Sequence, residues 1–370
     1  MNAPLKRFNP DDAACSYTLP AHYYYSPDIY RKELEVVFAR SWNFACHLSQ
    51  VKEPGQYVRC YAGEEEIVVT RDKEGKLRAF YNVCRHRAHT LVQQDHGNAG
   101  VLSCPYHAWT YNLDGTLRSA RNCDDVKGFC KEEFSLVGVK VEEFCAFVWV
   151  NLDPDAPSLA SQAGDLEVRV LEHCPDLYKL KFAHRLSWDV KSNWKTAMDN
   201  FSECYHCAPA HPGFTDLVNM STYTLDVHGI WSIHDGPPGQ SPPYKFTATG
   251  DRPQDYIAIL LWPNVTIWIM PGTGNISVLY MRPTGPESCT EHFDFYFMDE
   301  KPSEDEWASI VYLRDILQPE DIELCEKVQK GMRSRSFDVG RLIVDAKRSG
   351  ISEHATHHFQ SLVLKAHALA

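Results

Sequence analysis

The sequence lacks any apolar segment long enough to cross a membrane. Its longest apolar runs, such as Ile257–Trp262, fall far short of the roughly 20 residues that a spanning helix needs. The stretch from Met1 to Cys15 carries charges and prolines but no apolar core of the kind found in secretory signals. We therefore expect a cytoplasmic protein that does not associate with membranes.

Positive charge is scarce as well. The chain has 37 Lys and Arg residues against 49 Asp and Glu residues, which gives a net charge of −12. Proteins that bind nucleic acid present a basic face, so we expect no nucleic-acid partner. The acidic excess is typical of a solvated surface and is also compatible with a cationic ligand.

Internal repeats and low-complexity segments are absent too. Glycine (20) and proline (22) are not enriched, and 44% of the residues are hydrophobic, as in ordinary globular proteins. Cysteine is the exception, with thirteen residues in a chain of 370. Because the sequence shows no secretory signal, we expect a reducing compartment, where clustered cysteines serve metal or redox chemistry.

The hydrophobic pattern divides the chain into three parts. Residues 27–40 carry apolar side chains at helical spacing and predict a helical N-terminal lead-in, 1–40, that packs on the last domain. A small all-β domain at 41–155 follows, and the proline-containing linker Asp153–Ser158 lies at its end. The strands of this domain are expected at 56–61, 66–71, 77–82 and 144–152.

The remaining part, 156–370, mixes helices with strands, so the predicted fold class is α+β. Ser303 followed by Glu306 is a capping box, which predicts the start of a helix. Helices are expected at 194–207, 303–317, 319–333 and 352–366. Strands of one antiparallel sheet, flanked by these helices, are expected at 227–234, 257–262, 265–270, 276–282 and 292–298.

Two cysteines and two histidines of the all-β domain stand at a distinctive spacing. Cys84 and His86 form C-x-H, and Cys104 and His107 follow after seventeen residues as C-x-x-H. Two thiolates on one iron and two imidazoles on the other are the ligands of a mixed-ligand [2Fe–2S] cluster. Imidazole ligands raise the reduction potential to roughly −150 to +300 mV, which suits a centre that accepts electrons from a flavin reductase.

Structural zinc is the alternative, but zinc sites usually begin with C-x₂₋₄-C and end with H-x₃₋₅-H. The stretches 84–89 and 104–111 closely resemble the cluster motif of the Rieske oxygenases. This resemblance implies that Arg85, Arg87 and Trp109 surround the ligands and tune the potential through hydrogen bonding and solvent access. His89 lies outside the ligand spacing and is expected to be a structural neighbour.

A second group of potential metal ligands lies in residues 193–211. On a helix, Asp199, Glu203 and His206 stand at i, i+4 and i+7 and share one face. Pro209 is expected to end this helix and to leave His211 free to fold back toward His206. Two imidazoles and a carboxylate form the facial triad of non-haem Fe(II) oxygenases.

Each piece has a simpler interpretation when taken alone. A lone H-x₄-H at a helix end is more often structural, and the two acidic residues suit a solvated helix face. Cys204 and Cys207 have the spacing of a redox pair, but no thioredoxin-like βαβ pattern surrounds them. The joint occurrence with the first site favours a second iron.

The same segment resembles the D/E-x₃-D-x₂-H-x₄-H signature of the Rieske oxygenases. By that resemblance, His206 and His211 hold a mononuclear iron, and an aspartate more than a hundred residues later is the third ligand. Asp321 fits this position best, while Glu320 and Glu323 remain as competitors.

The resemblance also implies a role for Glu203, which stands where the family usually has aspartate. In the family, that carboxylate bridges a cluster histidine of one subunit and an iron histidine of its neighbour in a head-to-tail trimer. We therefore expect a homotrimer that uses O₂ and receives electrons from NAD(P)H through a separate flavin or iron–sulfur reductase. The longer glutamate leaves the geometry of the bridge open.

The stretches 204–214 and 348–354 look most like the family branch that acts on quaternary ammonium compounds. The resemblance implies a monooxygenase for a small cationic or zwitterionic substrate. N-demethylation of a betaine, such as proline betaine or glycine betaine, is expected ahead of carnitine or choline oxidation. Aromatic faces attract such cations. The candidate pocket residues are Phe201, Tyr205, Trp262 and Trp268.

Two rival interpretations remain. An aromatic-ring hydroxylating oxygenase would have a mostly apolar pocket and would oxidise arenes instead of quaternary ammonium compounds. A pure electron carrier would keep the cluster but lack the second iron.

Overall fold

The computed structural model describes residues 7–247 and 253–368, and the chain divides into two compact units. One unit combines the residues up to Val37 with those from Ser161 onward, and the other is Phe38–Ala160. The second unit differs from the predicted 41–155 by a few residues at each end. It reaches Ala160 because the N–H groups of Leu159 and Ala160 donate to the carboxylate of Glu142, at 3.0 and 3.2 Å.

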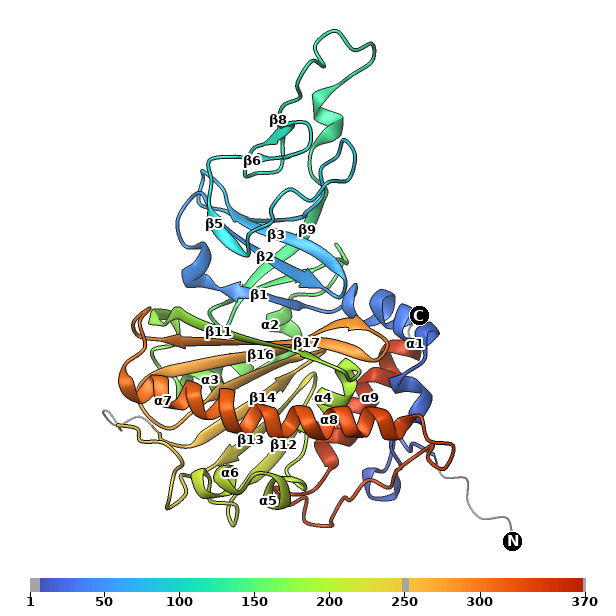
Figure 1. The fold of residues 1–370 in the computed structure, drawn as a ribbon, viewed down its shortest axis with the longest axis vertical. Helices are drawn as coiled ribbons and strands as arrows, with labels where there is room; N and C mark the ends of the chain where they lie inside the picture. Colours follow the sequence, from blue (N-terminus) through green and yellow to red (C-terminus); the bar gives the residue numbers. More distant parts are fainter. Residues whose placement is uncertain (1–6, 248–252, 369–370) are drawn as a thin grey trace. The chain divides into compact units, whose positions relative to one another are not determined.

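The unit 38–160 is almost entirely β. Its larger sheet is antiparallel with the strand order β1-β10-β9-β4-β3-β2-β5, and a smaller sheet has the order β6-β7-β8 (Figure 1). The strands are β1 Asn43–His47, β2 Gln56–Ala62, β3 Glu65–Arg71, β4 Leu77–Tyr81, β5 His96–Asn98, β6 Leu102–Ser103, β7 Thr110–Tyr111, β8 Leu117–Ser119, β9 Gly138–Phe144 and β10 Phe147–Asn151. The short helices are η4 Leu48–Val51 and η5 Lys131–Phe134.

Three predicted strands of this unit are confirmed as β2, β3 and β4. The strand predicted at 144–152 is wrong at its start, because β9 ends at Phe144 and β10 begins only at Phe147. Between them, Cys145 and Ala146 adopt positive φ angles of 54° and 60°, which reverses the chain in a tight hairpin turn. An apolar run without glycine or asparagine gave no sequence signal for this turn.

The other unit is built on a seven-stranded antiparallel sheet with the order β11-β17-β16-β15-β14-β13-β12. The strands are β11 Lys181–Val190, β12 Thr224–His228, β13 Trp231–Gly236, β14 Tyr256–Leu261, β15 Val265–Ile269, β16 Asn275–Gly285 and β17 Ser288–Phe297. The α+β class and the antiparallel sheet are thus confirmed. The strand predicted at 227–234 is wrong, since Gly229 and Ile230 separate β12 from β13, and β11 was not predicted.

The larger helices of this unit are α1 Pro27–Glu33, α2 Leu159–Ala163 (shared with the β unit), α3 Leu166–His173, α4 Trp194–Phe201, α5 Cys207–Ala210, α6 Pro212–Leu217, α7 Glu304–Tyr312, α8 Gln318–Met332 and α9 His354–Ala368. Further short helical segments, 3-10 or π in type, are η1 Ala13–Cys15, η2 Ala21–Tyr24, η3 Leu34–Phe38, η6 Leu177–Lys179 and η7 Leu313–Leu317. The predicted capping box starts α7, where Ser303 Oγ accepts from the N–H of Glu306 at 3.3 Å.

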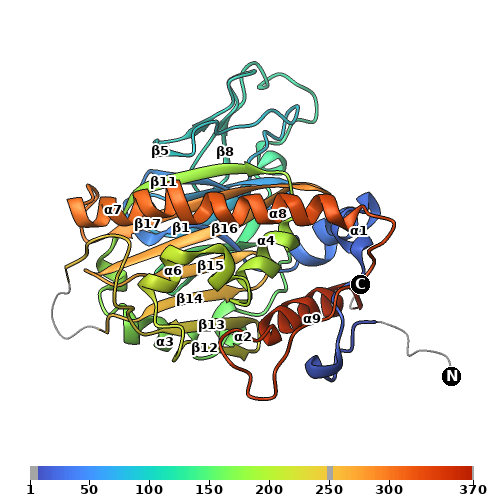
Figure 2. The same cartoon turned by 60° about the horizontal axis from the view of Figure 1, so that its bottom comes forward.

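The helices α7 and α8 are joined by η7 without a break from Glu304 to Met332. Figures 1 and 2 show this helix, in orange, running across the sheet. The shorter α4 packs against α8, α9 and β16. As a result, residues from α4 and α8, far apart in sequence, lie side by side above the sheet. Within residues 7–247 and 253–368, no helix is long and apolar enough to cross a membrane.

Candidate metal centres and substrate cavity

Two loops of the β unit carry the cysteine–histidine candidates on matching backbones. The N–H of Ala88 donates to the carbonyl of Cys84, and that of Ala108 donates to the carbonyl of Cys104, both at 3.0 Å. Ala88 and Ala108 adopt positive φ angles of 56° and 58°, which non-glycine residues seldom do. The repeated geometry turns both loops back in the same way and brings their side chains together.

In these loops the thiols are buried and the imidazoles lie nearer the surface. Cys84 and Cys104 are each 2% exposed, whereas His86 is exposed and His107 is partly exposed. The two imidazole rings lie 4.6 Å apart. Desolvation, together with the electrostatic influence of the neighbouring His86 and Arg87 side chains, lowers the pKa of His107, which favours the neutral imidazole that binds metals.

Aromatic side chains enclose these loops. Trp109 is buried and stacks on His86 with ring centroids 4.8 Å apart. The hydroxyl of Tyr111 lies 3.3 Å from Cys84 Sγ and accepts the N–H of Arg85 at 3.0 Å. Tyr111 lies within the motif at 104–111, but no role was predicted for it. Its position two residues after Trp109, within the motif, was the available signal.

The other predicted neighbours lie close by. The guanidinium of Arg87 lies over the ring of Tyr106 at 5.6 Å. His89 makes a local contact, since its Nδ1 lies 2.6 Å from the carbonyl oxygen of Thr90. This contact agrees with the expectation that His89 is a structural neighbour of the ligand candidates.

In the α+β unit, the helix predicted at 194–207 is confirmed as far as Phe201 but is wrong at its end. The helix α4 ends at Phe201, because Ser202 donates its N–H to the carbonyls of Met198 and Asp199 and its hydroxyl to Met198, at 2.6 Å. A serine that bonds back to its own helix disfavours further turns. Pro209 therefore does not end this helix but lies inside the short α5 that follows.

The end of α4 separates the residues that were predicted to share one helical face. Asp199 accepts hydrogen bonds from the Tyr24 hydroxyl at 2.5 Å and from Gln360 Nε2 at 3.0 Å. Burial raises the pKa of Asp199 to about 7, against the lowering effect of these bonds. Glu203 lies past the helix end and faces His206 instead. Asp199 thus belongs to the packing of the N-terminal segment.

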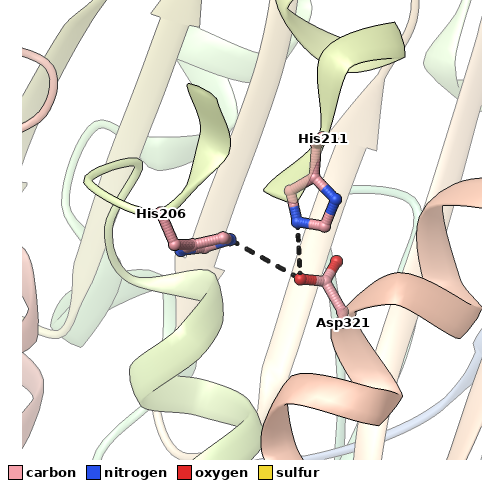
Figure 3. A group of neighbouring side chains, drawn as sticks. All are labelled: His206, His211 and Asp321. Carbon is pink, nitrogen blue, oxygen red and sulfur yellow. Dashed lines mark hydrogen bonds and ion pairs between the residues drawn. The ribbon is translucent and has the colours of Figure 1, made fainter. Parts of the chain in front are cut away.

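His206, His211 and Asp321 converge in spite of the broken helix (Figure 3). The Nε2 atoms of His206 and His211 lie 3.5 and 2.9 Å from the same oxygen, Oδ1 of Asp321. One potential ligand atom from each residue falls within 4.8 Å of the others. Each imidazole thus turns one nitrogen toward a common point, as a metal site requires.

The second nitrogen of each imidazole faces another carboxylate. His206 Nδ1 lies 2.5 Å from Glu203 Oε1, and His211 Nδ1 lies 2.7 Å from Glu320 Oε2. A carboxylate behind a metal-binding histidine fixes the ring and raises its basicity. Glu320, a competitor for the third ligand position, therefore lies behind a histidine, while Glu323 is exposed and pairs with Lys327.

The electrostatics of this cluster favour positive charge at its centre. Burial lowers the pKa of both histidines, but the carboxylate of Asp321 outweighs it, and Glu203 adds to this effect at His206. The pKa of His206 rises to about 10, and that of His211 rises as well. Burial raises the pKa of Asp321, but the two imidazoles outweigh it and lower the pKa overall. A divalent cation satisfies the same preference.

A cavity of about 600 Å³ adjoins these three residues. Its lining includes the aromatic residues Phe201, Phe214, Tyr223, Tyr256 and Trp268. Of the four predicted pocket aromatics, Phe201 and Trp268 line it, with their ring centroids 5.4 Å apart. The other two candidates, Tyr205 and Trp262, are not among the residues that line it.

The surroundings of Tyr205 and Trp262 explain why neither side chain lines the cavity. Tyr205 is 52% exposed because it lies in the turn after α4, and Trp262 packs on Trp194 and Phe359. Cys204 and Cys207, in the same turn, are joined by a disulfide in this structure. That bond closes the four-residue turn between Glu203 and the start of α5.

Two protein families match the chain. The family described as the Rieske [2Fe-2S] domain matches residues 41–130. The family described as the ring hydroxylating alpha subunit (catalytic domain) matches residues 177–368. The first range contains both cysteine–histidine loops, and the second contains His206, His211 and Asp321.

Relatives of the whole chain are found as well. The carnitine monooxygenase oxygenase subunit of Escherichia coli (strain K12) is 40% identical over 359 residues, which cover 96% of this chain and 94% of the relative. The chloroplastic choline monooxygenase of Spinacia oleracea is 29% identical over 365 residues, 95% of this chain and 77% of the relative.

A solved structure is similar over nearly the full length. It is a quaternary ammonium Rieske monooxygenase whose structure is described as giving insights into carnitine oxidation by gut microbiota and inter-subunit electron transfer. The TM-score is 0.92 at 37% sequence identity, with 98% of this chain and 100% of the other covered.

Proposed function

We propose that this protein hydroxylates a quaternary ammonium compound, and the premise is its family: the chain belongs to the alpha subunits of the Rieske non-haem iron oxygenases. Members of this family are oxidoreductases with a Rieske [2Fe–2S] domain and a catalytic domain that binds a mononuclear iron. The protein is accordingly an iron-dependent monooxygenase.

The side chains present fit both groups. Cys84 and Cys104 would hold one iron of the cluster, and His86 and His107 would hold the other. His206, His211 and Asp321 would hold the mononuclear iron, supported by their convergence within 4.8 Å. When bound, this iron activates O₂ with electrons that the cluster relays.

The observation that carries the substrate class is the aromatic lining of the cavity beside His206, His211 and Asp321. A quaternary ammonium has no N–H to donate, so it is recognised by aromatic faces, worth roughly 0.5–2 kcal/mol each. Trp268 lies at the centre of the lining, with Phe201 at 5.4 Å and Tyr256 at 6.0 Å between ring centroids. A cation in the cavity meets several of these faces at once.

Among quaternary ammonium compounds, carnitine is the better-supported substrate. The carnitine monooxygenase subunit is 40% identical and matches the chain from end to end, whereas the choline monooxygenase is 29% identical. The expected preference for proline betaine or glycine betaine is not supported by these relatives. We therefore place a carnitine-like zwitterion ahead of the small betaines.

The chemistry follows from where oxygen is inserted. Substrate, O₂, two electrons and two protons give a carbinol and water. If the hydroxyl is placed on the chain carbon next to nitrogen, the C–N bond breaks and yields trimethylamine, an aldehyde and a proton. If it is placed on an N-methyl group, the carbinol yields formaldehyde, the tertiary amine that has lost this methyl group, and a proton. The residues of the cavity select between these outcomes by orienting the ammonium.

Electron delivery is proposed to need further partners. A flavin or iron–sulfur reductase would pass electrons from NAD(P)H to the cluster. The hydrogen bond that Glu203 Oε1 accepts from His206 Nδ1 supports the chain's own half of the predicted bridge between subunits in a homotrimer. A cluster histidine of a neighbouring copy would supply the other half.

A substrate screen tests the proposal. The purified protein, loaded with iron, is incubated with NADH and a generic reductase in the presence of carnitine, γ-butyrobetaine, choline, glycine betaine or proline betaine. We expect carnitine or γ-butyrobetaine to react fastest, with trimethylamine released and little formaldehyde. Faster oxidation of a simple arene than of all five compounds would assign the protein to the aromatic-ring oxygenases instead.

A further inference from the structure

A buried glutamate lines the cavity without any cation beside it. Glu291 lies on β17, opposite Met281 of β16, and is only 2% exposed. Gln318 Nε2 donates to Glu291 Oε2 at 2.6 Å. Glu291, Met281 and Gln318 all line the cavity that His206, His211 and Asp321 also line.

The other deeply buried carboxylates of this unit show what is unusual here. Glu33 pairs with Lys195 at 2.7 Å, and Asp294, three residues after Glu291, pairs with Arg185 at 2.5 Å. Within residues 7–247 and 253–368, no Lys or Arg pairs with Glu291, and none lines the cavity. A buried carboxylate without a cation is costly, so the charged form of Glu291 lacks its partner in the chain itself.

Glu291 also stands next to the aromatic lining. Phe293, two residues along β17 on the same face of the strand, has its ring 5.4 Å from that of Trp268. Gln318 lies one helical turn before Asp321 on α8. The carboxylate therefore lies between the aromatic rings and the element that carries Asp321.

We propose that Glu291 determines specificity by supplying the counter-charge for the substrate's quaternary ammonium. This inference rests on the proposed function and assigns the charge recognition in that cavity to one residue. Aromatic faces alone attract a cation only weakly, and a carboxylate as deeply buried as that of Glu291 adds a much stronger attraction. The positive end of a carnitine-like substrate is thereby directed to the end of the cavity next to Asp321.

The protonation of Glu291 is consistent with a missing cation. Burial, with a smaller contribution from the charge of Asp321, raises the pKa of Glu291 to about 8, although the hydrogen bond from Gln318 opposes this. A bound cation favours the ionised form. A purely structural role would need only the hydrogen bond to Gln318, which a glutamine at position 291 also provides.

Equilibrium binding separates charge from shape. The iron-loaded protein is titrated anaerobically, by calorimetry, with γ-butyrobetaine and with 5,5-dimethylhexanoate, in which carbon replaces the quaternary nitrogen. We expect Glu291→Gln to weaken γ-butyrobetaine binding about 10- to 100-fold. Binding of the carbon analogue should change less than about threefold, because no charge is lost opposite it.

Glu287→Gln is the matched control. It removes one negative charge four residues earlier, but Glu287 pairs with Arg333 and Gln329 and does not line the cavity. Both ligands should bind to this variant as to the wild type. A crystal structure of the wild-type protein with γ-butyrobetaine gives a second measurement that needs no variant. The ammonium nitrogen should lie within about 6 Å of the Glu291 carboxylate.

Several results would overturn the proposal. Equal losses for both ligands in Glu291→Gln would show that the residue only shapes the cavity, and unchanged binding would show that it plays no part. An ammonium placed well away from Glu291 in the crystal would have the same meaning. If the wild-type protein bound none of the quaternary ammonium compounds, the proposed function itself would fail, and this inference with it.

Discussion

The two proposed metal sites are built from opposite kinds of local structure. In the β unit, the four candidates come from two short loops between Cys84 and His107, and backbone hydrogen bonds shape both loops alike. In the α+β unit, the candidates come from a broken helix and from α8, more than a hundred residues later. The residues of the first site lie within one short stretch of sequence, whereas those of the second site are distant in sequence and are brought together only by the fold.

The outer surroundings of the two sites differ as well. Aromatic rings and a tyrosine hydroxyl lie around the cysteines and His86, whereas carboxylates stand behind His206 and His211. A site that passes electrons needs a tuned potential, while a site that binds O₂ and substrate needs basic, fixed ligands beside a cavity. A substitution at one site, of a ligand or of a residue around it, should therefore leave the other site loaded.

The largest effect should come from removing the ligands themselves. His206→Ala or Asp321→Ala should abolish iron binding at the second site and turnover, and should leave the visible spectrum of the cluster intact. Cys84→Ser or Cys104→Ser should abolish that spectrum and turnover. Iron and acid-labile sulfide analysis with visible spectroscopy measures both. Loss of the cluster in Asp321→Ala would show that the two sites do not load independently.

Glu203→Gln should leave both sites loaded but disconnected. The amide keeps the size of the carboxylate and loses the charge that holds the histidine N–H groups, where charge-assisted bonds are the strong kind. Reduction of the cluster by the reductase should stay normal. In single turnover with substrate and O₂, the reduced cluster should fail to reoxidise. Normal reoxidation would place the bridge elsewhere.

Glu320→Gln should weaken the second site without removing it. Glu320 holds His211 Nδ1 at 2.7 Å, and loss of such a carboxylate typically costs 10- to 100-fold in metal affinity. Glu323→Gln is the control, since Glu323 is exposed and pairs with Lys327. Competition with a chelator measures iron affinity. A greater loss in Glu323→Gln than in Asp321→Ala would show that the third ligand is Glu323.

Tyr111→Phe should have the smallest effect, confined to the cluster. Removing the hydroxyl 3.3 Å from Cys84 Sγ takes away one hydrogen bond to the sulfur and should lower the reduction potential by some tens of millivolts. Redox titration of the cluster measures this shift. Iron affinity at His206 and His211 should be unchanged, and a shift there instead would contradict the division between the two sites.

The sequence predicted the cysteine–histidine loops well, because all their determinants lie within one short stretch. It predicted most strands and the start of α7 for the same reason, since alternation and capping are local. It failed at α4, whose end depends on Ser202 and on the packing of the turn that follows. Gly229 was a sequence signal for the hairpin between β12 and β13. It was missed because the apolar pattern at 227–234 was interpreted as one continuous strand.

Long-range contacts determine those parts of the second site that local sequence patterns did not predict. The sequence favoured Asp321 as the third ligand but left Glu320 and Glu323 as competitors. Only the packing of α8 against α4 shows that each carboxylate has a different partner. Glu291 gave no sequence signal at all, because a glutamate in a strand is ordinary until its neighbours are known. Only two of the four candidate pocket aromatics line the cavity for the same reason, since composition does not say which face of a helix or turn meets the sheet.

The central claim is that the two sites act together on a quaternary ammonium compound. The most direct test is a single turnover of the fully loaded, pre-reduced protein, mixed with carnitine and O₂ without any reductase. One electron from the cluster and one from the mononuclear iron should give close to one trimethylamine per chain, formed as the cluster reoxidises. Reoxidation of the cluster without any product from carnitine, γ-butyrobetaine or choline would contradict the account.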